Sequence, residues 1–222
     1  MISRSATARR MGRPERRPLY VFGYGSLMWR PDFAYGGSWP AEAIGMRRAL
    51  CVWSSAHRGS PKRPGLVFGL DQGALDDRVR GVLFQVAPKH RRATIAYLFQ
   101  RELIYPIYQP ALIAVERDGE TVQALSFTVD RADPAYAAGL APEIRIAAIA
   151  SGAGRAGRAR DYLANALTRL ADMGAPEPTL MAELAAADRL PDDPAHLFAL
   201  FDEAARRRLD TVFEQSHESL AI

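Results

Sequence analysis

The fold is decided by the stretch Leu19-Tyr20-Val21-Phe22-Gly23-Tyr24-Gly25-Ser26-Leu27-Met28-Trp29. An apolar, β-favouring run enters a Gly-Tyr-Gly-Ser turn and then resumes with large apolar side chains. Glycine takes backbone angles that other residues avoid, and it lets a ligand approach the main chain closely. Successive N–H groups in such a turn can form a concavity that binds an anion. Taken alone, the pattern also fits a strand that simply ends in a glycine-rich turn.

Composition indicates one soluble globular domain. The chain has 222 residues, of which 48% are hydrophobic and 24% are charged. This length is sufficient to bury a proper core in one unit. No window approaches the ~18 apolar residues of a membrane helix, so we expect no membrane span. The single Cys51 cannot form an internal disulfide, which favours a cytoplasmic location.

The basic excess of the chain lies in its first 17 residues. The formal net charge is +4, yet residues 1–17 hold six Arg and one Glu and carry +5 by themselves. The remaining residues therefore sum to −1. Because no aromatic residues are interleaved with these arginines, we expect no nucleic-acid partner. We predict a disordered basic tail over 1–17 and a single domain over 18–222.

The order of predicted elements favours an α+β fold. Strands are expected at 19–24, 44–53, 65–70, 81–86, 111–116 and 121–129, with a helix from about 89 to 103. Asp118-Gly119 predicts a hairpin between the last two strands, since both residues tolerate positive φ. After Pro134 we expect helices at 142–150, 160–170 and 179–190. A final helix of about twenty residues is expected to begin at Asp193-Pro194.

Glu102 occupies an unusual place in the helix that precedes it. Helical spacing puts it between Leu98 and Phe99, in the middle of an apolar stripe that also contains Ile95 and Leu103. Burial there would raise the pKa of the carboxyl group, as a general base and acid working near neutral pH requires. A frayed helix end, or a salt bridge to Arg101, would explain the same pattern without catalysis.

Other motifs do not have the context that their chemistry needs. The Gly152-x-Gly154-x-x-Gly157 pattern follows a predicted helix, whereas a dinucleotide site needs strand, turn and helix. Ser26 lacks the second glycine of a nucleophile elbow. The four His and one Cys show no metal-ligand spacing, so we expect no metal and no cofactor. His57-Arg58 is either a contact for a substrate carboxylate or a polar loop that fixes its own turn.

Several motifs in order along the chain carry a resemblance to a known family. They are the opening glycine stretch, His57-Arg58-Gly59 with Pro64-Gly65, Arg101-Glu102 with Tyr108 and Pro110, Pro134-Ala135-Tyr136, and the Gly-rich 151–157 followed by Asp161-Tyr162-Leu163. Across roughly residues 19 to 185 the chain resembles the ChaC-like γ-glutamylcyclotransferases. The resemblance implies a small mixed or antiparallel, barrel-like sheet flanked by helices.

The resemblance also implies an activity and a set of site residues. The implied activity is cleavage of glutathione to 5-oxoproline and Cys-Gly by attack of the substrate's own α-amine, with Glu102 as base and then acid. The implied substrate-binding residues are Val21, Phe22, Gly23, Tyr24, Gly25, Ser26, Leu27, Tyr108 and Tyr136. Alternatives are a cyclotransferase for other γ-glutamyl compounds and a non-catalytic glutamyl sensor.

The chain departs from the family's pattern in two places. The segment 103–107 lacks the glycine that relatives carry after the catalytic acid, which leaves open which tyrosine faces the substrate. The stretch before Tyr162 lacks the usual Asn and has Arg158-Ala159-Arg160-Asp161 instead. This second departure concerns the part of the site that would hold the second half of the substrate.

Overall fold

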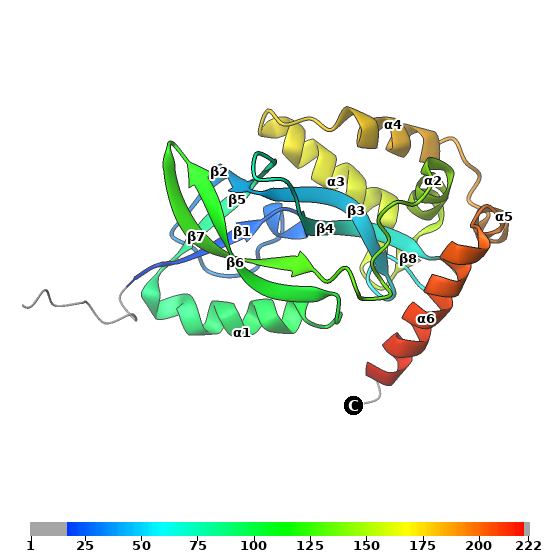
Figure 1. Cartoon of the computed structure of the whole chain (residues 1–222), viewed down its shortest axis with the longest axis horizontal. Coiled ribbons are helices and arrows are strands. Elements are labelled where there is room, and N and C mark those ends of the chain that lie inside the picture. Colours follow the sequence, from blue (N-terminus) through cyan, green and yellow to red (C-terminus); the bar gives the residue numbers. More distant parts are fainter. Residues whose placement is uncertain (1–16, 220–222) are drawn as a thin grey trace, which may run out of the picture.

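A closed barrel of five strands forms one end of the molecule (Figure 1). The computed structural model describes residues 17–219, so the predicted tail lies almost entirely outside the described residues. The barrel strands are β1 (Leu19–Gly23), β2 (Gly37–Ile44), β5 (Arg78–Val86), β6 (Tyr108–Arg117) and β7 (Glu120–Val129), paired in the order β1-β5-β2-β6-β7. All neighbours pair antiparallel except β1 and β7, which meet in parallel at Val21 and Leu125 and close the barrel.

A long antiparallel hairpin connects the barrel to the helices. It consists of β3 (Met46–Ser54) and β4 (Gly65–Gln72). Strand β4 contacts β7 of the barrel and also α2 and α3. The loop 55–64 between the two strands therefore lies among the helices rather than at the barrel.

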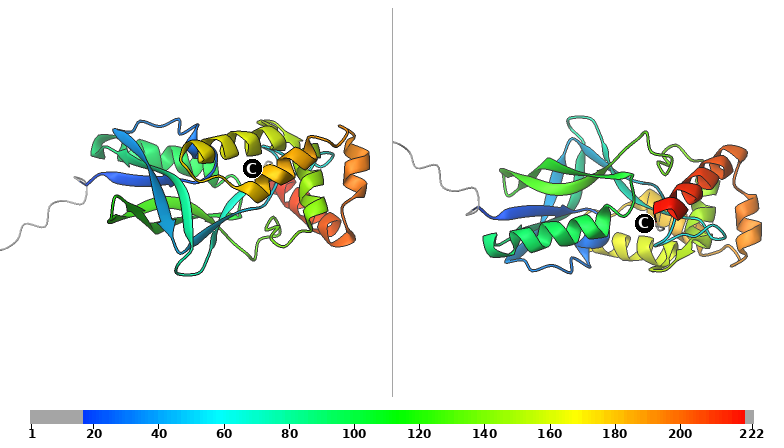
Figure 2. Two further views of the ribbon diagram at one scale, coloured as in Figure 1. Left: turned by 90° about the horizontal axis from the view of Figure 1, so that it is seen from above. Right: turned by 90° about the horizontal axis from the view of Figure 1, so that it is seen from below.

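The helices gather on two sides. Short 3-10 turns are η2 (Ser26–Met28) and η3 (Pro88–His90), and α1 (Arg91–Glu102) runs alongside the barrel. The other helices, α2 (Pro142–Ser151), α3 (Ala159–Asp172), α4 (Pro178–Ala187), α5 (Pro194–Ala199) and α6 (Glu203–Ser219), cluster at the opposite end (Figures 1 and 2). Between α2 and α3 lies a small hairpin of β8 (Ala153–Gly154) and β9 (Gly157–Arg158).

The structure confirms the α+β prediction and most elements of it. The hairpin turn falls at Asp118 and Gly119, with φ of 52° and 81°. Strand β2 was not predicted, because Pro40 interrupts its sequence pattern. Pro40 is tolerated because β2 pairs with β6 only at Glu42 and Ala43, so Pro40 lies beyond that ladder.

The prediction of one long final helix is wrong. The structure has two helices, α5 and α6, with a break at residues 200–202. The Asp202 carboxylate accepts a hydrogen bond from the N–H of Ala205 at 2.7 Å, which starts a new helix. The break lets Phe201 turn inward and pack on Trp53, with ring centroids 5.7 Å apart, while Leu200 stays 44% exposed.

One continuous core joins the barrel interior to the helices. Its largest fully buried side chains include Phe22, Phe127, Trp53 and Leu163. They come from the barrel, the β3–β4 hairpin and α3. Over residues 17–219, no helix is long and apolar enough to cross a membrane.

Candidate active site

A cavity of about 410 Å³ lies where the barrel meets the β3–β4 hairpin and α3. Its size falls within the range of small-molecule sites, about 300–1,000 Å³. The lining comes from the glycine turn after β1, the end of α1, the loop after β3, the β8–β9 hairpin and α3. Segments far apart in the chain therefore converge on this cavity.

The glycine turn supplies one wall of the cavity. Phe22, Tyr24, Gly25, Ser26 and Leu27 all line it, and all five are among the substrate-binding residues that the family resemblance implies. Val21 and Gly23 do not: Val21 is fully buried in the core, and Gly23 lies against the turn. A Cβ on Gly23 would be 2.8 Å from the Cβ of Leu27, so this glycine permits the tight return of the chain.

The Tyr162 hydroxyl lies so close to Gly25 that no larger residue fits there without a shift. A Cβ at this position would be 2.9 Å from the hydroxyl oxygen of Tyr162, a distance that real Cβ atoms essentially never show. Within residues 17–219, the N–H groups of Gly25, Ser26 and Leu27 donate to no acceptor. The turn therefore has donors available for an anion, as the sequence indicates.

Glu102 lines the same cavity from the last residue of α1. Its side chain is 19% exposed, and its Oε1 lies 3.1 Å from Nε of Arg101. The salt bridge that could have explained Glu102 without catalysis is thus present. It does not remove Glu102 from the cavity, because Arg101 lines the cavity as well.

Arg101 ties Glu102 to the glycine turn. Its guanidinium donates to the Ser26 hydroxyl at 2.9 Å, to the Tyr97 hydroxyl at 2.8 Å and to the Arg30 carbonyl at 2.6 Å. These contacts fix the end of α1 against residues 26–30. The position of the Glu102 carboxylate relative to the turn is set in this way.

The environment of Glu102 raises the pKa of its carboxyl group. Burial is the largest cause, and the charge and hydrogen bond of Arg101 act in the opposite direction. Burial outweighs the neighbouring cation, so the protonated form is favoured more than in an ordinary glutamate. The carboxyl group is thereby suited to exchange a proton near neutral pH.

Three tyrosine hydroxyls surround this part of the cavity. Tyr24 donates to the carbonyl of Phe127 at 2.9 Å, and Tyr108 donates to the carbonyl of Phe68 at 3.0 Å. Tyr162 accepts a hydrogen bond from the N–H of Phe68 at 3.3 Å. Burial, and to a lesser extent the nearby Glu102, raises the pKa of all three phenols, which therefore stay neutral.

Tyr136 does not lie at this cavity. It pairs with Val52 in an isolated bridge, and its hydroxyl donates to Oδ2 of Asp71 at 2.6 Å. Burial and the charge of Asp71 raise the pKa of Tyr136 to about 12. Asp71 also receives a hydrogen bond from Nε of Arg131 at 2.7 Å. Tyr136 thus belongs to a polar cluster with Asp71 and Arg131, none of which lines the cavity.

The more exposed part of the cavity is built around His57. Nη2 of Arg155 lies 2.9 Å from Nε2 of His57. Because a guanidinium only donates, Nε2 is the acceptor and the ring proton resides on Nδ1. That proton is donated to the Tyr105 hydroxyl at 2.8 Å, which also accepts from the His57 backbone N–H at 2.9 Å.

His57 is therefore neutral, and cations surround it. Burial is the main cause, followed by the charges of Arg155, Arg58 and Arg101, and together they lower the pKa of His57 from 6.5 to about 4. Arg58 lies over the ring of Tyr162, 5.7 Å from its centroid. The His57-Arg58 motif thus lies at the cavity, and the backbone N–H of Arg58 also donates to the Ser54 hydroxyl at 2.8 Å, which helps to fix the turn of its own loop.

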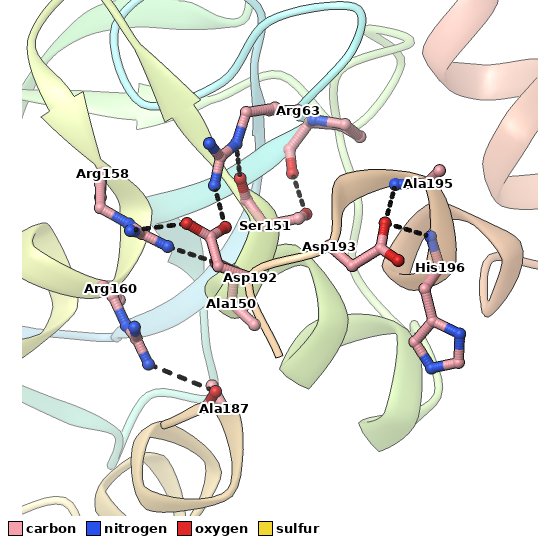
Figure 3. A network of polar contacts seen from close by, with 11 residues as sticks. Arg63, Ala150, Ser151, Arg158, Arg160, Ala187, Asp192, Asp193, Ala195 and His196 are labelled. Carbon is pink, nitrogen blue, oxygen red and sulfur yellow. Dashed lines mark hydrogen bonds and ion pairs between the residues drawn. The ribbon is translucent and has the colours of Figure 1, made fainter. Parts of the chain in front are cut away.

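A network of ion pairs holds the two loops that form this exposed part (Figure 3). Asp192, from the segment between α4 and α5, accepts hydrogen bonds from Arg63 and from Arg158, the latter at 3.2 Å. Arg63 also donates to the carbonyl of Ser151 at 2.8 Å. One carboxylate thus connects the loop that carries His57 and Arg58 to the hairpin that carries Arg155.

Sequence reasoning missed Tyr162, Arg101, Tyr105 and Arg155 as cavity residues. Tyr162 had a usable signal, because it lies in a matching motif and on the buried face of α3 with Leu163 and Ala166. For Arg155 the sequence carries no such signal beyond its place in the glycine-rich segment. In the described part of the chain, no three His, Cys, Asp or Glu side chains are grouped so that they could hold a metal ion.

Comparisons with known proteins agree on one family. The model of the ChaC-like protein family matches residues 19–187. A glutathione-specific gamma-glutamylcyclotransferase from Escherichia coli K12 is 31% identical over 163 residues, which cover 73% of this chain and 69% of that protein. The human glutathione-specific gamma-glutamylcyclotransferase 1 is 35% identical over 161 residues, which cover 69% of this chain and 68% of that protein.

A solved structure supports the same fold. The gamma-glutamyl cyclotransferase specific to glutathione from yeast superimposes with a TM-score of 0.69 at 22% identity, covering 78% of this chain and 96% of that one. The family match ends at residue 187, the last residue of α4, so α5 and α6 lie outside it. On these matches, the chain belongs to the ChaC-like protein family.

Proposed function

We propose that the protein is a glutathione-specific γ-glutamylcyclotransferase, which releases 5-oxoproline and Cys-Gly. The observation that carries this proposal is a carboxyl group with a raised pKa, Glu102, in a cavity of suitable size beside free backbone donors. The relatives from Escherichia coli and human, both named for glutathione, support the choice of substrate.

Glu102 would act first as base and then as acid. Its carboxylate accepts a proton from the substrate's α-ammonium group, and the freed amine attacks the γ-carbonyl carbon. A five-membered ring closes, and the bond from that carbon to the cysteine nitrogen breaks. The protonated Glu102 then gives its proton to the departing nitrogen, and the second proton that the attacking nitrogen loses on ring closure passes to the same nitrogen, so that Cys-Gly leaves with a protonated amine. No water is consumed, and the enzyme begins and ends with the same protonation state.

The protein's main contribution would be to hold the substrate folded. Orientation of reacting groups contributes about 7–11 kcal/mol in favourable intramolecular cases. The free N–H groups of Gly25, Ser26 and Leu27 are suited to bind the α-carboxylate. Arg101 links this turn to Glu102, so the groups that would bind and the group that would react are held by one side chain.

The neutral phenols would complete the pocket for the glutamyl part. Tyr108 is the tyrosine, of the two predicted, that lines the cavity. Its hydroxyl hydrogen is engaged by the Phe68 carbonyl, so its oxygen is left to accept a hydrogen bond. An acceptor there suits the α-ammonium group before it loses its proton.

We further propose that the protein works in the cytoplasm without a metal or an organic cofactor. The free thiol of Cys51 is buried, and burial raises its pKa to about 12, which keeps it unreactive. In a reducing compartment the glutathione available to the protein would be in its thiol form. The chemistry above needs only groups that this chain supplies.

The test is an end-point product analysis. Purified full-length protein is incubated with glutathione and, separately, with γ-glutamyl-alanine and γ-glutamyl-amines, and 5-oxoproline is measured. We expect 5-oxoproline and Cys-Gly in equal amounts from glutathione only. If only the other compounds are turned over, glutathione is not the substrate of this enzyme. If glutathione binds and no compound is turned over, the protein is a sensor and not an enzyme.

A further inference from the structure

Two arginines in the exposed part of the cavity have no carboxylate partner. Within residues 17–219, the guanidinium of Arg58 donates only to the carbonyl of Arg158 at 3.5 Å, and that of Arg155 donates only to His57, so neither forms an ion pair. Burial lowers the pKa of Arg58, and Asp161 opposes this only as a charge at a distance. The third cation here, Arg30, lies 3.9 Å from Asp32. This part of the cavity therefore has an excess of positive charge.

The structure holds Arg155 in place although its side chain is exposed. The backbone N–H of Arg155 donates to the carbonyl of Ala56 at 2.9 Å, and that of Ala156 donates to the carbonyl of His57 at 2.9 Å. Gly154 allows this contact, since a Cβ there would be 2.4 Å from the Ala56 carbonyl oxygen. Arg155 thus lies against the loop that carries Arg58, and both side chains line the cavity.

The neutral His57 orients the guanidinium of Arg155. Its Nε2 accepts one N–H group, while its Nδ1 proton is engaged by Tyr105. The remaining donors of the guanidinium have no acceptor in the described part of the chain. A planar group with several free donors matches a carboxylate or a phosphate, and of these two a γ-glutamyl peptide carries carboxylates.

We propose that Arg155 and Arg58 form a subsite for a free carboxylate at the far end of the leaving group. This inference rests on the proposed function and refines its substrate class to γ-glutamyl peptides with a free C-terminus. From the γ-carbonyl of such a tripeptide to its terminal carboxylate is about 7 Å, two residues at up to about 3.6 Å each. Glu102, Arg58 and Arg155 all line the same cavity of about 410 Å³.

The subsite acts on binding more than on the chemical step. The carboxylate keeps its charge throughout the reaction, so its contacts are equally strong in the ground state and in the transition state. Uniform binding of this kind lowers KM and leaves kcat nearly unchanged. Arg155 is therefore a specificity-determining residue and not a catalytic one.

The experiment compares glutathione with its C-terminal glycinamide, which keeps the shape and lacks the charge. Steady-state kinetics are measured for the wild type and for Arg155→Ala, with Arg92→Ala as a control. Arg92 is an exposed arginine on α1 that does not line the cavity, so this control removes one positive charge elsewhere. Arg155→Lys keeps the positive charge but loses the planar guanidinium, which can donate two parallel hydrogen bonds to one carboxylate.

We expect the wild type to show about a tenfold higher KM for the amide, with similar kcat. Arg155→Ala should raise KM for glutathione by a similar factor and leave that for the amide nearly unchanged. Arg155→Lys should recover part of the difference, and Arg92→Ala should behave as the wild type. Equal KM values for acid and amide in the wild type would overturn the subsite while the cyclotransferase activity stands.

A binding measurement keeps this test independent of turnover. The dissociation constants of glutathione and its amide are determined by calorimetry on Glu102→Gln. If no γ-glutamyl compound is turned over, the proposed function fails, yet a tenfold difference between the two ligands would still support the subsite. Equal affinities would overturn it.

Discussion

The two parts of the cavity differ in how they are held and in what they contain. The buried part has one carboxyl group and three neutral phenols, fixed by hydrogen bonds to strand groups of β4 and β7. The exposed part has unpaired arginines around a neutral histidine, on loops held by Asp192. A buried, rigid environment shifts a pKa and fixes geometry, as proton transfer requires. An exposed cationic one attracts an anion but contributes little to the reaction itself.

Substitutions in the two parts of the cavity are expected to change different kinetic constants. Changes in the buried part are expected to lower kcat, because they alter the reacting groups or their distances. Changes in the exposed part are expected to raise KM, because they alter charge at a site that binds uniformly. Measurements that separate kcat from KM therefore test whether the division is real.

The largest effect is expected from Glu102→Gln. The amide keeps the shape of the side chain but cannot accept and return a proton, and general acid–base catalysis contributes about 10²–10⁴ in rate. We expect kcat to fall by that factor, with the affinity for glutathione largely retained. Glu214→Gln, an exposed change on α6, serves as the control. Retention of more than a tenth of the wild-type rate would show that Glu102 is not the base.

Gly25→Ala should have the next largest effect. The new methyl group would displace the Tyr162 hydroxyl or the turn itself, since the two would be 2.9 Å apart. A shift of about 1 Å at a reacting geometry costs up to about 100-fold in rate. Gly36→Ala is the matched control, because the nearest atom to a Cβ there is 3.8 Å away. Equal activity of both variants in the 5-oxoproline assay would argue against a tight turn.

Asp192→Ala tests the exposed part. Loss of the carboxylate releases Arg63 and Arg158 and loosens both loops. Because both ion pairs of Asp192 are partly exposed, we expect only about a two- to fivefold rise in KM for glutathione, with kcat unchanged. Asp210→Ala on α6 removes an exposed carboxylate that does not line the cavity. A fall in kcat without a change in KM would show that Asp192 supports the reacting groups instead.

The smallest effect is expected in the pH dependence of stability. The pKa of His57 is lowered from 6.5 to about 4, so between these values the unfolded chain binds a proton that the folded protein does not. This residue therefore destabilises the fold progressively as the pH falls from 6.5 towards 4. Thermal unfolding of the wild type and His57→Gln should show that the wild type loses more Tm over this range. Parallel curves would mean that His57 titrates normally.

The same contrast explains what the sequence could predict. The glycine turn and Glu102 lie in continuous motifs, and local periodicity was enough to place Glu102 on an apolar face. That the glycine turn and Glu102 line the same cavity was implied only by the family resemblance. Periodicity was less reliable in detail, because Phe99 on the same predicted stripe is 38% exposed.

The exposed part could not be predicted, because it depends on pairing between distant segments. His57 and Arg155 are 98 positions apart, and they meet only because the β8–β9 hairpin lies along the loop after β3. Tyr136 shows the opposite failure. Its motif matched, but Asp71 on β4 holds its hydroxyl away from the cavity. Neither contact leaves a trace in local sequence.

In the proposed mechanism the attacking atom is the substrate's own α-amine, activated by Glu102. This mechanism is tested most directly by incubating the protein with glutathione and with N-acetylglutathione and quantifying 5-oxoproline, glutamate and Cys-Gly. The acylated nitrogen cannot attack, so we expect no cleavage of N-acetylglutathione, and from glutathione 5-oxoproline without free glutamate. Stoichiometric glutamate, or Cys-Gly released from the acylated substrate, would contradict cyclisation and the role assigned to Glu102.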